Sequence, residues 1–230
     1  MSTLSQMPKP DAERFRKGRK LYLVPLFVVP MEVPDDLGQM LDRYWTGSNG
    51  HIASLESALG PVSRIYHETV FLPGEEGAKL VEQINPRGYG MLRQRLDAGA
   101  HLEALEEQVL VEESTDWQRC LTVGLVSQKV TALAMQSYID VTGKRYESMA
   151  SKIDETLEED ESAILLVGDN HRVQFPSDIE VFYVSPPALN EIRRWIDDQM
   201  NERSPAAEES GDPPPTPAEA GAEGDAEAPG

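Results

Sequence analysis

Histidine and carboxylate side chains occur together at two separate points in this sequence. His67 and Glu68 are adjacent, and Asp169, Asn170 and His171 follow one another much later in the chain. Imidazole and carboxylate groups together can bind a divalent metal ion or act as a general acid and base. The sequence therefore predicts a metal-assisted hydrolase with a divalent metal as cofactor, in which His67, His171 and Asp169 are metal ligands and catalytic groups.

Each of these residues also has a purely structural interpretation. Neighbouring side chains in a strand point to opposite faces, so only one of His67 and Glu68 can face a given site. The sequence Gly-Asp-Asn-His over 168–171 also suits a tight turn. His101, Glu103, Glu106 and Glu107 are expected on one acidic helix, where they either add ligands or simply face solvent.

The better-defined catalytic motifs are missing from the sequence. It contains no His-Glu-x-x-His pair, no Gly-x-Ser-x-Gly elbow and no phosphate-binding loop. Cys120 is the single cysteine, which excludes an internal disulfide and a zinc site made of thiolates. Its apolar helical neighbours predict a core position for Cys120.

Apolar runs alternate with helical patterns between residues 20 and 200. Strands are expected at 21–29, 62–71, 163–167 and 179–184, with helices between them. This order predicts an α/β fold whose small, mainly parallel sheet has about four strands, with a large helical insertion at about 74–160 between the second and third. Pro25 suggests an edge position or a bulge for the first strand. A helix break is expected at 46–50, and a kink at Gly143 in a long helix over 127–159.

The predicted strands place the candidate chemistry at one edge of the sheet. In open parallel sheets, ligands bind beyond the carboxyl ends of the strands. The segment 67–68 lies in the second strand and 169–171 follows the third. If these two strands are neighbours, we expect their polar side chains to converge there.

Three regions are expected along the chain: a basic leader at 1–20, one α/β domain at 21–203 and a disordered acidic tail at 204–230. The tail has seven acidic residues, no basic residue and no large apolar side chain. With 21 basic and 40 acidic residues, the net charge of -19 argues against binding to nucleic acid. The apolar run at 21–31 is too short to span a membrane and is followed by no signal-peptide cleavage site, which predicts a cytoplasmic protein.

The segment Arg-Tyr-Glu-Ser-Met-Ala-Ser-Lys-Ile at 145–153 is followed by the strand 163–167 and then Gly-Asp-Asn-His. This arrangement resembles the closing motif of the TraB/PrgY and erythromycin-esterase-like superfamily, in which an Arg-x-x-x-Met-Ala-x-x-Ile helix precedes a strand ending in Gly-x-x-His. The resemblance implies a metal-dependent hydrolase or protease, or a ligand-binding protein, with Arg145 and His171 in the active site and Arg145 as an anion clamp. The chain as a whole looks like a bacterial α/β family with no assigned activity.

Two other functions remain open at this point. The acidic run Glu103–Asp116 and the tail suit a non-catalytic interaction protein or scaffold that docks a basic protein partner. The same fold also suits a small-molecule sensor, with His67 and Asn170 as hydrogen-bonding groups. Asn170 and Glu68 are the candidate cofactor-binding residues. The sequence leaves the oligomeric state open.

Overall fold

The computed structural model describes residues 15–202 apart from positions 28 and 31, so most of the expected leader and the whole expected tail lie outside the described residues. The elements in chain order are β1 (Arg19–Leu26), α1 (Asp35–Leu59), β2 (Arg64–His67), α2 (Gly74–Ile84), α3 (Pro86–Asp97), β3 (His101–Leu102), α4 (Gln108–Thr122), α5 (Gln128–Thr156), β4 (Ser162–Gly168), β5 (Ile179–Tyr183) and α6 (Ala188–Glu202).

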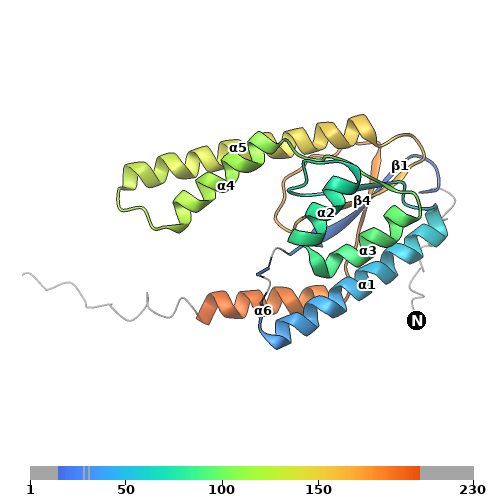
Figure 1. Ribbon diagram of the computed structural model, residues 1–230, viewed down its shortest axis with the longest axis horizontal. Helices are drawn as coiled ribbons and strands as arrows, with labels where there is room; N and C mark the ends of the chain where they lie inside the picture. The colour runs from blue at the N-terminus through green and yellow to red at the C-terminus, as the bar shows by residue number, and fades with distance from the viewer. Residues whose placement is uncertain (1–14, 28, 31, 203–230) are drawn as a thin grey trace, which may run out of the picture. The chain divides into compact units, whose positions relative to one another are not determined.

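The five strands form one parallel sheet in the order β3-β2-β4-β1-β5. The predicted α/β class and parallel sheet are confirmed. The helical insertion between β2 and β4 carries the short strand β3, which the sequence patterns did not predict. Figure 1 shows α1 and α3 on one side of the sheet and α5 on the other. No helix among the described residues is long and apolar enough to cross a membrane.

One hydrophobic core lies between the sheet and α5. On the α5 face, Tyr66, Leu165 and Val167 pack with Met149 and Ile153 of α5. The continuous apolar sequences of β1 and β4 follow from burial on both faces, as parallel sheets covered by helices require.

The position of Pro25 corrects one expectation, because β1 is an interior strand between β4 and β5. The pairing of β1 with β5 ends at Leu23, whose carbonyl accepts a 2.8 Å hydrogen bond from Val184 N. Backbone groups two residues apart point to the same side, so Pro25 also faces the β5 side, beyond the last pair. No ladder bond is lost there, and the Pro25 carbonyl accepts a 2.6 Å bond from the Tyr44 hydroxyl.

The expected break at 46–50 is wrong, since α1 runs without interruption from Asp35 to Leu59. A Cβ atom on Gly47 would lie 2.8 Å from the Pro186 Cβ. Glycine at this position therefore allows close packing against Pro186, and the helix tolerates its weaker propensity. Helix α5 is continuous through Gly143, in agreement with the single long helix expected there.

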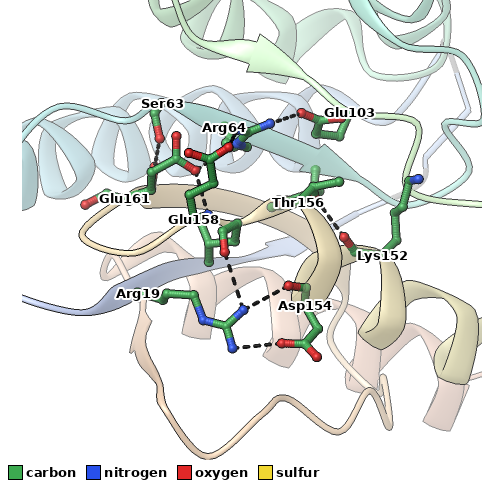
Figure 2. Close-up of polar contacts among 12 residues, drawn as sticks. Arg19, Ser63, Arg64, Glu103, Lys152, Asp154, Thr156, Glu158 and Glu161 are labelled. Carbon is green, nitrogen blue, oxygen red and sulfur yellow. Dashed lines mark hydrogen bonds and ion pairs between the residues drawn. The ribbon is translucent and has the colours of Figure 1, made fainter.

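Charged side chains bind the amino ends of the strands to the end of α5 (Figure 2). Arg64 at the start of β2 contacts Glu161 at 2.8 Å and Glu103 at 2.5 Å. Arg19 at the start of β1 contacts Asp154 of α5 at 2.8 Å. The Arg19 pair ties β1 to the last turns of α5, and the Arg64 pairs tie β2 to the loop between α5 and β4 and to the residue that follows β3.

The prediction for Cys120 is wrong, because this residue is exposed on α4. In Figure 1, α4 and α5 form an antiparallel hairpin. Ser114 is the buried residue of α4, so most of this helix faces solvent and an apolar residue on it need not be in the core.

Candidate functional site

The carboxyl ends of β2 and β4 meet, as expected for neighbouring parallel strands. His67 is in register with Leu166, and Glu68 N donates to the Leu166 carbonyl at 2.8 Å. The Glu68 carboxylate accepts a 2.7 Å hydrogen bond from Gly168 N. A Cβ on Gly168 would lie 3.3 Å from this carboxylate, so a glycine leaves room for the contact.

Arg145 of α5 forms a two-point ion pair with Glu106 beside Glu68. Its Nε donates to Oε2 at 2.5 Å and its Nη2 donates to Oε1 at 2.6 Å. Glu106 Oε1 also accepts from Thr69 N at 2.6 Å, and Arg145 Nη1 donates to Ser114 Oγ at 3.2 Å. We refer to Glu68, Thr69, Glu106, Ser114 and Arg145 as the carboxyl-edge cluster.

The cluster holds two carboxylates and one guanidinium in a largely dry setting. The side chains of Glu106, Arg145 and Glu68 are 1%, 11% and 18% exposed, and Arg145 Nη2 lies 3.6 Å from Glu68 Oε1. Burial raises the pKa of Glu68, and the Gly168 N–H and the Arg145 charge act in the opposite direction. Arg145, predicted as an anion clamp, is therefore already paired within the protein.

Glu106 also stabilises an unusual backbone conformation. Thr69 has φ +70°, a left-handed value that β-branched residues rarely adopt. Its N–H is bonded to Glu106, and the following turn is closed by Val70 N donating to the His67 carbonyl at 3.1 Å. The cluster thus fixes the chain direction as it leaves β2.

His67 does not face this cluster. Tyr66 packs on the α5 side of the sheet, so the adjacent His67 points to the opposite face. The His67 side chain is buried, its Nδ1 donates to the Glu68 carbonyl at 2.6 Å, and Nε2 has no partner among the described residues. Burial lowers the pKa of His67 to about 4. His67 is thus buried in the core on the face opposite to the cluster, and its predicted catalytic role stays a prediction.

The residues after β4 form the turn that the sequence offered as an alternative to a site. His171 N donates to the Gly168 carbonyl at 3.0 Å, and Val173 N donates to His171 Nδ1 at 3.3 Å. The His171 ring lies 5.9 Å from that of Phe175, and burial lowers the pKa of His171. Asp169 accepts a 2.9 Å bond from the Tyr183 hydroxyl.

The predicted metal site is not formed. Within the part of the chain that the structure describes, no group of three or more His, Cys, Asp or Glu side chains could hold a metal ion. His67 lies inside β2 and points to the α1 face of the sheet. His171 lies in the turn that follows β4. The described residues therefore do not bring His67, His171 and Asp169 into one group of ligands.

Sequence reasoning missed the role of Glu106, which was expected on a solvated helix with His101. The segment is instead the strand β3 followed by a loop, with His101 exposed and Glu106 buried. The sequence did contain a signal that this segment is buried, because the apolar residues Leu102 and Leu105 precede Glu106. Both are buried in the structure. The partner Arg145 is too distant in the sequence for any local spacing to reveal the pair.

A pocket of about 780 Å³ lies between α5 and the segment that follows β4. We refer to it as the α5 pocket. Its lining residues on the later segment are polar, and those on α5 are mainly aromatic, aliphatic or hydroxyl-bearing: Asn170, Arg172 and Gln174 on the first, and Tyr138, Ile139, Thr142, Gly143, Tyr146, Glu147 and Ala150 on the second.

The α5 pocket adjoins the carboxyl-edge cluster through Tyr146. Tyr146 lines the pocket, and burial and the charge of Glu68 both raise its pKa. Arg145, the next residue along α5, belongs to the cluster itself. The cluster and the pocket thus share the stretch of α5 at residues 145–147.

No family model matches the chain, and no curated protein or solved structure matches it significantly. The resemblance drawn from residues 145–171 stays a prediction.

Proposed function

We propose that this chain is a small-molecule-binding protein and that its binding site is the α5 pocket. The observation that carries this proposal is the position of the pocket beside the residues that leave the carboxyl end of β4. Parallel α/β sheets bind ligands beyond the carboxyl ends of their strands. The volume of about 780 Å³ also suits a small organic molecule.

The lining supports binding because it combines flat apolar surface with polar groups that the protein itself does not use. The hydroxyl of Thr142 is buried and has no hydrogen-bond partner among the described residues. Tyr138, Tyr146 and Asn170 add further donors and acceptors around the same pocket. A few convergent polar groups on an apolar wall are typical of ligand sites.

The carboxyl-edge cluster supports binding more than catalysis. Glu106 and Arg145 are bonded to each other, and Glu68 is bonded to Gly168 N. These contacts hold α5 in place at one side of the pocket. Metal-assisted hydrolysis is not proposed, since the described residues offer no set of metal ligands.

The interaction hypothesis assigns the acidic surface and the tail to a basic partner. The tail at 204–230 lies outside the described residues, and this hypothesis stays a prediction.

Two matched glycine variants test the proposed function. Gly143 in α5 lines the pocket, and an added Cβ there would meet no atom within 4 Å. Gly90 in α3 has the same open surroundings and lies away from the pocket. Leucine at either position improves helix propensity, so both variants should fold.

Ligands are first found by screening a small-molecule library for compounds that raise the melting temperature of the natural protein, with affinities then measured by calorimetry. We expect Gly143→Leu to lose at least tenfold in affinity and Gly90→Leu to bind as the natural protein does. Equal binding by both variants, or the absence of any stabilising compound, would contradict the proposed site.

A further inference from the structure

We infer that the ligand of the α5 pocket is a small organic monoanion, a carboxylate carried on a flat apolar body, and that Arg172 binds its charged group. This inference rests on the proposed function and adds the chemical class of the ligand. It depends on three features of the pocket lining: a guanidinium that forms no ion pair with the described residues, two tyrosine rings and one carboxylate. They belong to Arg172, to Tyr138 and Tyr146, and to Glu147.

Arg172 differs from most arginines of this acidic chain. Eight of them form ion pairs with carboxylates of the protein: Arg19, Arg43, Arg64, Arg87, Arg93, Arg95, Arg119 and Arg145. Arg172 makes no such pair with any residue that the structure describes, although the protein has many more acidic than basic groups. Its guanidinium is therefore available to an anion in the pocket that it lines.

The guanidinium also has the right chemistry for a carboxylate. Its planar fork of N–H donors matches two carboxylate oxygens and stays charged at any physiological pH. The Arg172 carbonyl accepts a 3.4 Å bond from Gln174 Nε2. This contact links the backbone at Arg172 to another lining residue on the same segment.

The opposite wall of the pocket suits a flat apolar body. Tyr138 and Tyr146 present rings from α5, and Ile139 and Ala150 lie on the same wall. Aromatic rings attract flat ligands through offset or edge-on contacts in addition to the area that they bury. The buried Thr142 hydroxyl offers a further hydrogen bond to a polar atom of the ligand.

The balance of charge favours a monoanion over a dianion such as a phosphate monoester. Arg172 is the cationic residue in the lining, and Glu147 is the anionic one. A second negative charge on the ligand would meet Glu147 and the field of a chain with a net charge of -19.

The experiment compares three probes of one shape: 2-naphthoate, its neutral amide 2-naphthamide and the cation 2-naphthylmethylamine. Calorimetric titrations use the natural protein, Arg172→Gln and the control Arg119→Gln, whose arginine lies on α4 and is largely exposed. We expect 2-naphthoate to bind the natural protein about 2- to 5-fold more tightly than the amide, the gain that an exposed ion pair gives. Arg172 is exposed, so water screens its charge, and Arg172→Gln should lower the affinity for 2-naphthoate by about 2- to 5-fold. Arg119→Gln should not.

The outcomes separate this inference from the proposed function. Equal affinities for 2-naphthoate and its amide, or an unchanged affinity in Arg172→Gln, overturn the anion assignment. If Gly143→Leu still abolishes binding in that case, the pocket stands and only the ligand class is wrong. If no naphthyl probe binds at millimolar concentration, the proposed ligand class is overturned as well. The library screen with Gly143→Leu then shows whether the α5 pocket binds any ligand.

Discussion

The buried His67 makes the stability of this protein depend on pH in a way that can be calculated. Burial lowers the pKa of His67 from 6.5 to about 4. The unfolded chain binds a proton at this residue below about pH 6.5, whereas the folded chain does so only near pH 4. Protons therefore favour the unfolded state, and the stability contributed by neutral His67 is present above pH 6.5 and lost as the pH falls towards 4.

The size of the effect follows from these two pKa values. Between pH 8 and pH 5.5, proton binding by the unfolded chain should lower the free energy of unfolding by about 1.4 kcal/mol through His67 alone. His67→Asn removes the titration and keeps a side-chain N–H that can donate to the Glu68 carbonyl in place of Nδ1. The variant should be less stable at every pH because the ring is lost, but its stability should fall less on acidification.

The assay is urea denaturation at pH 8 and pH 5.5 for the natural protein, His67→Asn and the control His101→Asn, whose histidine is exposed on β3. The fall in unfolding free energy between the two pH values should be about 1.4 kcal/mol larger for the natural protein than for His67→Asn, and His101→Asn should behave as the natural protein does. Parallel pH profiles for His67→Asn and the natural protein would refute the reasoning. If His67→Asn does not fold, NMR titration of the natural protein's four histidines gives the same answer, since one ring should remain neutral down to pH 5.

Three further predictions concern packing, the buried ion pair and the thiol. Gly47→Ala should lower the free energy of unfolding by about 1–3 kcal/mol in urea denaturation, because its Cβ would meet the rigid Pro186 ring; a gain in stability would show that the contact relaxes freely. Glu106→Gln should cost about 3–5 kcal/mol in the same assay, because it leaves the buried Arg145 without its closest counter-charge, and a loss under 1 kcal/mol would contradict that. Cys120 should react with Ellman's reagent in the folded protein nearly as fast as in 6 M guanidinium chloride, and strong protection would show that the thiol is covered.

Strands β1 and β4 were predictable because burial on both faces gives continuous apolar runs, as at 163–167. Strand β3 was not, since its two residues are too short to show any period. The unbroken α1 was missed for a different reason. Gly47 has poor helix propensity, but the packing against Pro186 outweighs this local preference.

The sequence identified part of the carboxyl-edge cluster but not its organisation. Glu68 was named as a candidate cofactor-binding residue and Arg145 as an anion clamp implied by the resemblance, and the structure places both in this cluster. Side chains alternate along β2, so His67 points to the face opposite to Glu68. The sequence alone does not show which of the two faces the cluster occupies. Glu106 and Arg145 meet only through the tertiary fold, and such pairs leave no spacing pattern in the chain.

The order of the strands has a consequence for synthesis. Interior strand β1 pairs with β4 and β5, which begin 143 and 160 residues after the start of β1 (162 − 19 and 179 − 19). At roughly 5–20 residues per second, β1 waits about 7–28 s for its first neighbour. During that interval its apolar residues have no partner strand, so a nascent chain stalled before residue 162 should depend on chaperones to stay out of aggregates.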